Sequence, residues 1–118
     1  MAHRRWRLYR TSSGRSPVRE FLDDLTDSHA ASIAAAMREV AVDGLVAARH
    51  LTGDIYEVRA DGDHQGFRVL FAAEGLESQV LLALEAFSKR TQRTPPPRIA
   101  VAQRRLTDWR RRGRSSHG

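Results

Sequence analysis

The sequence predicts a single α+β domain with the element order β-α-α-β-β-β, followed by a C-terminal helix. Three observations support this fold class. Polar and apolar residues alternate near the N-terminus and again from residue 55 onward, which is typical of strands. Between these stretches, apolar residues recur at helical spacing. A chain of 118 residues has the size of one domain, so we expect residues 1–118 to form one domain with a disordered tail from about residue 111 to 118.

The N-terminal part predicts one strand and a helical hairpin. The stretch "RRWRLYRT" alternates, with Trp6 and Leu8 facing one way. Ser16 can cap a helix whose first position is Pro17. Gly44 is a plausible end for a second, alanine-rich helix. The apolar stripes that would cover one face of the sheet are Val18, Phe21, Leu22 and Leu25 in the first helix and Ile33, Met37, Val40 and Ala41 in the second.

The segments "IYEVRA" and "FRVLFA" flank the turn-rich "DGDHQG" and predict an antiparallel hairpin. If Ala60 pairs with Phe67, the helix-covered face receives the apolar side chains. Arg59 and Arg68 then become direct cross-strand neighbours on the opposite face. Two adjacent arginines repel each other unless an anion lies between them.

The run "SQVLLALEAF" is apolar at almost every position and predicts a strand covered on most of both faces. Alternation along it predicts two sets of side chains. Val80, Leu82 and Leu84 belong to the helix-covered face, and Leu81, Ala83, Glu85 and Phe87 to an open face with Lys89 at its edge.

A final helix is predicted after the strands. Thr94 can cap it, Pro95 lies in its first turn, and an apolar stripe follows at about 3.6-residue spacing. The stripe consists of Ile99, Ala102, Leu106 and Trp109.

The charge is unevenly distributed along the chain. Residues 1–86 contain 10 Lys or Arg against 13 Asp or Glu, whereas residues 87–118 contain 10 against one. Such asymmetry favours a polyanionic partner, because neutralised phosphates release condensed counterions. A solvated basic tail is the alternative explanation.

Composition excludes several other classes of protein. The absence of cysteine excludes disulfides and thiolate chemistry, and the five histidines lack metal-ligand spacing, so we expect no metal site and no cofactor. No apolar run approaches the roughly 18 residues of a membrane span, and the basic N-terminus lacks the apolar stretch of a signal peptide. We expect a soluble, cytoplasmic protein that does not bind membranes.

The predicted open face gathers ionisable side chains that could form an anion site. Its members are Arg59, Arg68 and Glu85, with Lys89 and Arg90 at the strand end. A surface salt-bridge network explains the same pattern equally well, because Glu85 and the nearby Glu57 could simply neutralise the arginines.

Three motifs resemble the phage-derived, HigB-like branch of the RelE superfamily of bacterial toxins. They are "IYEVR", "FRVLF" and above all "FSKRTQRTPPPRI", within a resemblance that extends over 51–106. The resemblance implies the RelE-like fold and the toxin of a type II toxin–antitoxin system. Such a toxin is a ribosome-dependent mRNA endoribonuclease that inhibits translation, needs no metal and is held inactive by a helix-turn-helix (HigA/Xre-like) antitoxin.

The resemblance also implies site residues. Arg59, Arg68, Lys89 and Arg90 match the family's basic positions, and Glu85 stands where relatives often have a histidine. Cleavage of RNA without a metal uses the substrate's own 2′-hydroxyl, so the protein must move protons and stabilise phosphorane charge. Arginines suit the second role, and Glu85 or Lys89 is a candidate base. The residues expected to bind RNA phosphates are Arg93, Arg98, Arg104 and Arg105.

Two other functions fit the same sequence. One is a non-catalytic nucleic-acid-binding module that uses the same basic face. The other is a degenerate phage-derived protein kept for contact with a helix-turn-helix partner.

Overall fold

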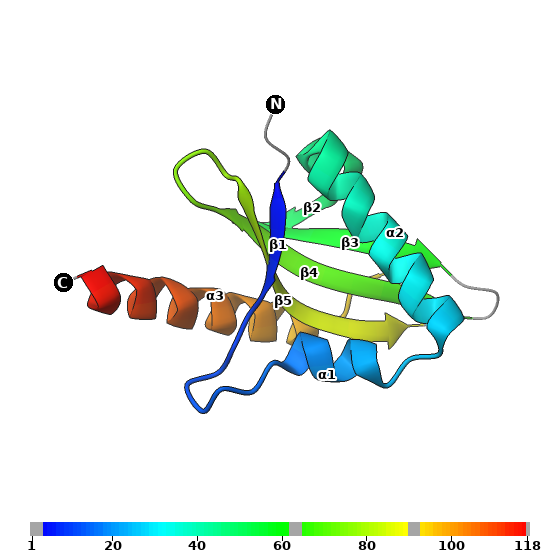
Figure 1. Cartoon of the computed structure of the whole chain (residues 1–118), viewed down its shortest axis with the longest axis horizontal. Coiled ribbons are helices and arrows are strands. Elements are labelled where there is room, and N and C mark those ends of the chain that lie inside the picture. The colour runs from blue at the N-terminus through cyan, green and yellow to red at the C-terminus, as the bar shows by residue number, and fades with distance from the viewer. Residues whose placement is uncertain (1–3, 62–64, 90–92, 118) are drawn as a thin grey trace.

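The computed structural model describes residues 4–61, 65–89 and 93–117, with side chains up to residue 113. Its described residues form one mixed sheet of five strands in the order β1-β5-β4-β3-β2, with helices on both faces (Figure 1). The strands are β1 (Arg5–Leu8), β2 (Arg49–Thr52), β3 (Ile55–Asp61), β4 (Gly66–Glu74) and β5 (Val80–Lys89). The helices are α1 (Pro17–Asp23), α2 (Asp27–Asp43), the short 3₁₀ helix η1 (Leu45–Ala47) and α3 (Pro96–His117).

The predicted α+β class, the strand–helix–helix beginning and the central hairpin are confirmed. β3 and β4 pair in the predicted antiparallel register, with Ala60 opposite Phe67 and Arg59 directly opposite Arg68. β1 closes the sheet on the other side by pairing in parallel with β5. β2 was not predicted, because this strand is short, polar and exposed at most positions on the sheet edge.

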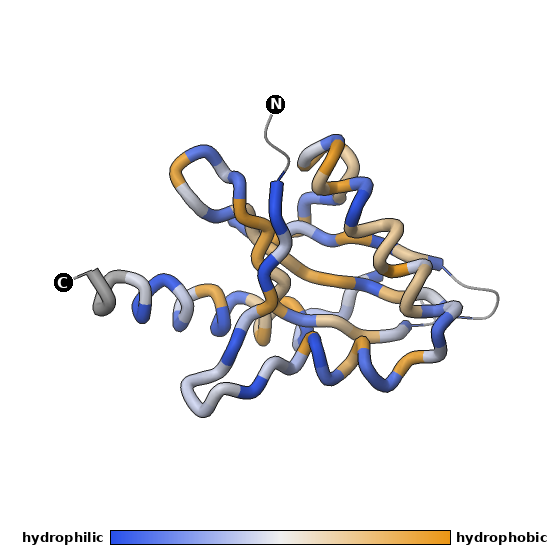
Figure 2. The backbone as a smooth tube through the Cα atoms, in the orientation of Figure 1, coloured by the Kyte–Doolittle hydropathy of each residue, from blue (hydrophilic) through white to orange (hydrophobic). Residues whose placement is uncertain are grey.

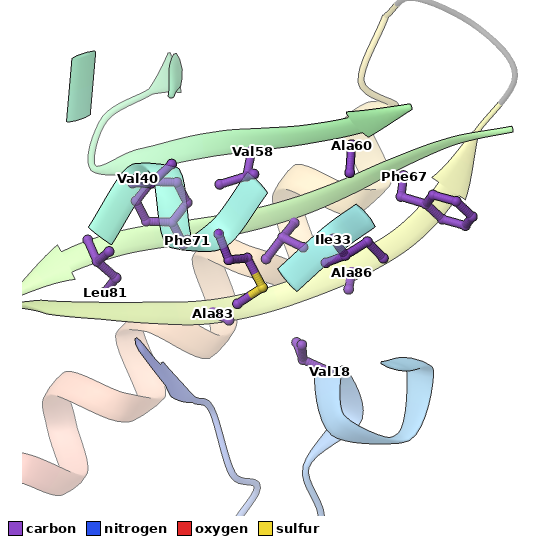
Figure 3. Packing of buried hydrophobic residues seen from close by; sticks show 12 residues of the cluster. Val18, Ile33, Val40, Val58, Ala60, Phe67, Phe71, Leu81, Ala83 and Ala86 are labelled. Carbon is purple, nitrogen blue, oxygen red and sulfur yellow. The ribbon is translucent and has the colours of Figure 1, made fainter. Parts of the chain in front are cut away.

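Helices α1 and α2 cover one face of the sheet, as predicted for the helical hairpin (Figure 1). Figure 3 shows Ile33 and Val40 of α2 beside Val58 and Phe71, and Val18 of α1 directed toward β5. The Trp6 ring meets Phe71 edge to face, with ring centroids 5.0 Å apart. This layer is an apolar core built from both helices and four strands.

Helix α3 covers half of the opposite face, so the prediction that this face is open is wrong. Ala102 and Leu106 of α3 are buried against Leu70, Leu82 and other strand residues. This docking follows from the apolar stripe, because Ile99 and Trp109 pack against the same cluster. Figure 2 shows hydrophobic residues concentrated in the strands and hydrophilic residues prevailing in α3.

A β-bulge in β5 corrects the predicted parity of this strand. Leu70 pairs with Glu85 and Phe71 pairs with Ala83, so Leu84 is the extra residue. Leu81 and Ala83 therefore lie in the core beneath α1 and α2, whereas Leu82 and Leu84 lie beneath α3. These four assignments are the reverse of the prediction, and the alternation is as predicted again from Glu85 onward.

Two predicted caps differ in the structure. Ser16 occupies the N-cap position of α1, but its hydroxyl makes no capping hydrogen bond. Thr94 does not cap α3, because the helix begins at Pro96 and the Thr94 hydroxyl bonds a sheet residue instead. The helix continues to His117, and the disordered tail from about residue 111 stays a prediction. Within the described residues, no helix combines the length and apolar composition needed to cross a bilayer.

Candidate active site

The half of the sheet face that α3 leaves uncovered carries a cluster of charged side chains from four strands. We call Arg49, Glu57, Arg59, Arg68 and Lys89 the cationic cluster. Arg49 pairs with Glu57 across β2 and β3, and Arg59 pairs with Arg68 across β3 and β4. Lys89 lies opposite Gly66 at the end of β5. Strand alternation thus places four cations and one carboxylate on a common surface.

Glu57 is the acidic centre of the cationic cluster and is only 1% exposed. One carboxylate oxygen accepts a hydrogen bond from Arg59 Nε at 2.9 Å. The other accepts the hydroxyl proton of Thr94, which is also buried. A buried carboxylate without hydrogen-bond donors is energetically costly, so these two bonds stabilise the Glu57 side chain in its buried position. Thr94 thereby fixes the start of α3 beside the cluster.

Arg68 is 5% exposed and directs part of its guanidinium toward the sheet end. Its Nη1 donates to the Phe67 carbonyl at 2.9 Å and to Asp61 Oδ1 at 3.1 Å. Its Nε is buried and has no hydrogen-bond partner among the described residues. Arg68 is therefore held in place through Nη1, while its Nε is enclosed without a hydrogen-bond partner among the described residues.

Lys89 is 8% exposed, and its Nζ has no hydrogen-bond partner among the described residues. Burial lowers the pKa of Lys89 below its usual value, and the neighbouring charge of Arg68 lowers it further. Glu57 acts in the opposite direction, and Arg59 and Arg49 add smaller lowering effects. Because its pKa is lowered, Lys89 loses its proton more readily than a solvated lysine does. A proton acceptor must be in this neutral form.

Glu85 lies on the same face but binds helix α3. Its Oε2 accepts from Arg98 at 3.1 Å, and its Oε1 accepts from Arg105 at 3.2 Å and from the Ala86 backbone N–H at 3.1 Å. Arg105 also donates to the Leu84 carbonyl at 2.7 Å. Glu85 therefore anchors two arginines of α3 to β5, and Leu70 separates it from Glu57 across the sheet.

The four predicted RNA-binding arginines lie in different surroundings. Arg93 and Arg49 line a pocket of about 330 Å³ beside the cluster, together with Leu51, Thr94 and Ile99. Arg98 stacks over the Phe87 ring at 5.0 Å in addition to pairing with Glu85. Arg104 is exposed on α3. Arg90, predicted as a catalytic residue, lies outside the described residues.

The structure brings Arg59, Arg68 and Lys89 together as predicted, and it adds residues that the sequence did not assign to the site. These are Arg49 on the unpredicted strand β2 and Glu57 with its donor Thr94. A sequence signal existed for Glu57, because it lies two residues before Arg59 on the same strand face. Chemically, the arrangement combines three arginines and a buried amine around one buried carboxylate, which suits the binding of an anion. Among the described residues, no group of three or more His, Cys, Asp or Glu side chains could hold a metal ion.

Comparison with known proteins identifies the family of this chain. The model of the family described as "Phage derived protein Gp49-like (DUF891)" matches residues 20–107. The chain belongs to the Gp49-like family. This confirms the phage-derived branch that the motifs indicated, and the matched range contains every residue of the cationic cluster as well as Thr94.

Two curated relatives of this Gp49-like chain come from Mycobacterium tuberculosis, strains CDC 1551 / Oshkosh and ATCC 25618 / H37Rv. Each is 35% identical over 109 residues, which covers 90% of this chain and 85% of the relative. Both carry the name "Probable endoribonuclease HigB1". The similarity to these relatives covers more of the chain than the family model, which matches only residues 20–107.

Proposed function

We propose that this chain is the toxin of a type II toxin–antitoxin system, an endoribonuclease that cuts mRNA on the ribosome without a metal ion and so inhibits translation. The observation that carries this proposal is the buried Lys89 amine between Arg68, Arg59 and Arg49. Burying a cation beside other cations costs stability, and such strain is typical of functional sites. The similarity to proteins named probable endoribonucleases supports the same reaction class.

In the proposed reaction, the RNA supplies its own nucleophile. Neutral Lys89 accepts the proton of a ribose 2′-hydroxyl, and the 2′-oxygen forms a bond to the adjacent phosphorus. The bond from phosphorus to the 5′-oxygen breaks, that oxygen takes a proton from a water molecule, and Lys89 later returns its proton to the solvent. The products are a 2′,3′-cyclic phosphate and a 5′-hydroxyl, with no change in oxidation state. General base catalysis of this kind contributes roughly 10²–10⁴-fold.

Arg68 and Arg59 stabilise the charge that develops on the phosphorane oxygens in this proposal. The guanidinium charge of Arg68 is preorganised by the bonds that its Nη1 donates. Glu57 and Thr94 hold Arg59 and the start of α3 in position, so they are positioning residues. Arg90 is retained as a catalytic candidate from the family motif. We assign Glu85 to anchoring α3, because both its oxygens are engaged by arginines.

The remaining arginines would bind RNA phosphates around the cluster. Arg93 lies beside the pocket that Leu51 and Ile99 line with apolar surface, where a neighbouring base could rest. Arg98, Arg104 and Arg105 present cations along α3. We further propose that the chain acts in the cytoplasm and that a helix-turn-helix antitoxin of the HigA type holds it inactive.

The test is induction of the chain without an antitoxin. Wild type should arrest growth and produce mRNA fragments with 5′-hydroxyl ends on translating ribosomes. Arg68→Ala should lower the single-turnover cleavage rate about 10²–10³-fold, because it removes a donor to the developing charge. Arg38→Ala, an exposed arginine on α2 at the other sheet face, is the matched control and should cleave as wild type does.

Other outcomes would separate the alternative functions. Salt-dependent RNA binding with intact RNA on translating ribosomes would replace the nuclease with a non-catalytic binding module. A harmless wild type whose effect on its partner is unchanged by Arg59→Ala and Arg68→Ala would indicate a degenerate phage-derived protein.

A further inference from the structure

A second pocket lies at the free edge of β1, away from the cationic cluster. Its volume is about 370 Å³, near the lower end of the range for ligand pockets, about 300–1,000 Å³. Both tryptophans of the chain, Trp6 and Trp109, contribute to its wall. The other lining residues are Arg7, Leu8, Arg10, Ser16 and Arg19. All seven lie outside residues 20–107, the range matched by the family model.

The pocket has a strongly cationic lining. Arg7, Arg10 and Arg19 are exposed and come from β1, the segment after it and α1. Within the described parts of the chain, none of the three forms an ion pair with a carboxylate. The lining contains no acidic residue. Three cations without a counterion around one pocket favour an anionic ligand.

The aromatic part of the pocket is held rigidly. The Trp6 indole N–H donates to the Met37 carbonyl at 2.7 Å, and its ring packs against Phe71. The Arg7 guanidinium lies over the Trp109 ring at 5.1 Å from the centroid. Planar guanidinium and indole groups in this arrangement form a preorganised surface on which another flat ring can stack.

Two kinds of polar donor complete the pocket. The Ser16 hydroxyl oxygen is buried and has no hydrogen-bond partner in the described structure. β1 is an edge strand, and the N–H groups of Arg5 and Tyr9 donate inward to carbonyls of Gln79 and Ala83. Because alternate residues of a parallel strand bond to the same neighbour, the N–H groups of Trp6 and Leu8 point toward the free edge.

We propose that this pocket binds one nucleotide of a single-stranded RNA, with its base stacked on the Arg7–Trp109 pair and its phosphates on the pocket arginines. The inference rests on the proposed function, since it gives the RNA substrate a second contact on the same protein. Arg98, next to the cationic cluster, and Trp109 are separated by about 16 Å along α3 at 1.5 Å per residue. Exposed Arg104 lies between them on the helix. One RNA strand can follow α3 from the cluster to this pocket.

Stacking favours RNA over an acidic peptide as the ligand. Carboxylates would satisfy the arginines but would leave the stacked Arg7–Trp109 pair without a matching flat partner. A nucleotide matches both features, because every base has an aromatic face and every linkage has a phosphate. Neither feature reads the identity of the base, so we expect binding that tolerates different sequences.

The test uses wild-type protein and a 2′-O-methyl oligoadenylate of about ten nucleotides, within the known range of single-strand site sizes. This probe lacks the 2′-hydroxyl nucleophile and cannot be cut by the proposed reaction. Because the chain has no tryptophan elsewhere, its intrinsic fluorescence reports on this pocket, and we expect quenching when the oligonucleotide binds. Adenosine monophosphate serves as the comparison ligand.

Variants then locate the binding site by fluorescence anisotropy of the labelled oligonucleotide. Trp109→Leu keeps apolar packing but removes the stacking ring, and we expect the Kd to rise about five- to a hundredfold. Replacing any one of the three pocket arginines with Gln should weaken binding and lower the salt slope by about one. Arg38→Gln makes the same charge change on α2 and should bind as wild type does.

Several results would overturn the inference. These are oligonucleotide binding without tryptophan quenching, pocket variants that bind no more weakly than Arg38→Gln, and quenching by adenosine monophosphate as strong as by the oligonucleotide. The last result would assign the pocket to a free nucleotide. Oligonucleotide binding in this pocket by a protein that never cuts mRNA would refute the proposed nuclease but retain the site. Conversely, if the wild type cuts mRNA on ribosomes but the pocket variants bind the oligonucleotide as the wild type does, the nuclease would be retained and the site refuted.

Discussion

The two faces of the sheet differ in the kind of side chains that they bury. The face beneath α1 and α2 is packed with apolar side chains such as Ile33, Val69 and Phe71. The face toward α3 is apolar only where Ala102, Leu106 and their neighbours cover it. All the buried charged side chains among the described residues lie on this second face, and buried Thr94 bonds one of them. They are Glu57, Arg68, Glu85 and Lys89.

This difference separates stability from function. Apolar burial stabilises the fold by roughly 25 cal/mol per Å² of buried surface, whereas a buried charge needs partners to be tolerated. Glu85 has these partners in Arg98 and Arg105, but Lys89 has no hydrogen-bond partner among the described residues. The α1/α2 face therefore supplies the stability that allows the other face to hold an unfavourable group. The predictions below test this separation.

The largest effect is expected for Lys89→Met, which keeps the length of the side chain but removes the amine. If Lys89 is the proton acceptor, the single-turnover rate of cleavage on ribosomes should fall about 10²–10⁴-fold. The free energy of unfolding at neutral pH should stay equal or rise, because a buried ammonium is removed. Glu85→Gln is the comparison, and an equal or greater loss of rate in that variant would transfer the base to Glu85.

If Lys89 is the base, the cleavage rate must depend on pH. The pKa of Lys89 is lowered in the folded chain, so the neutral base forms as pH rises through that lowered pKa. The cleavage rate should therefore increase with pH and level off above it. The unfolded chain binds the Lys89 proton more tightly, so wild-type stability relative to Lys89→Met should also rise with pH between the lowered and the ordinary pKa. A rate that falls over this range would contradict the role of base.

Phe71→Ala tests the other face. Phe71 is fully buried and contacts the rings of Trp6 and Tyr56 at centroid distances of 5.0 and 5.9 Å. Removing this ring should lower the free energy of unfolding by about 3–5 kcal/mol in urea denaturation. The folded fraction should retain its cleavage rate. A selective loss of rate at unchanged stability would break the separation between the faces.

Glu57→Gln should give the smallest and most specific change. Glutamine keeps the shape of Glu57, and its carbonyl oxygen can still accept the bond from Arg59, while its NH2 group can donate to a rotated Thr94 hydroxyl. Because the charge of Glu57 raises the pKa of Lys89, the midpoint of the pH–rate profile should shift to lower pH. Single-turnover rates across a pH series measure this shift. An unchanged midpoint would show that Glu57 and Lys89 are not electrostatically coupled, and an upward shift would contradict the assignment of Lys89 as the base.

The sequence predicted those parts of the fold that follow from local periodicity. Alternation with a period of two predicted that Arg59 and Arg68 share a face, and the assumed pairing of Ala60 with Phe67, which is confirmed, made them direct neighbours. Helical spacing likewise predicted the buried stripes of α2 and α3. Both signals lie within one element or between adjacent elements, where sequence patterns are most informative.

The wrong predictions concern features of the fold that depend on tertiary contacts. The run from Val80 to Leu84 is apolar on both faces, so its composition could not reveal the bulge that reverses its parity. The stripe of α3 was predicted, but nothing local showed that it packs on the face expected to be open.

The charged site was only partly predictable for the same reason. Parity placed Glu57 on the correct face, yet its role depends on Thr94, 37 positions later in the chain. Arg49 was missed together with β2, because a short polar edge strand has almost no signal of its own.

The parallel pairing of β1 with β5 has a consequence for folding during synthesis. Arg5 is among the first described residues, but its partner Val80 is made 75 positions later. Until then, β1 has no strand to pair with, and pairing across such long separations is intrinsically slow. Lys89, Thr94 and the α3 arginines emerge later still. The site therefore stays unfinished during synthesis until β5 and the residues of α3 have been made.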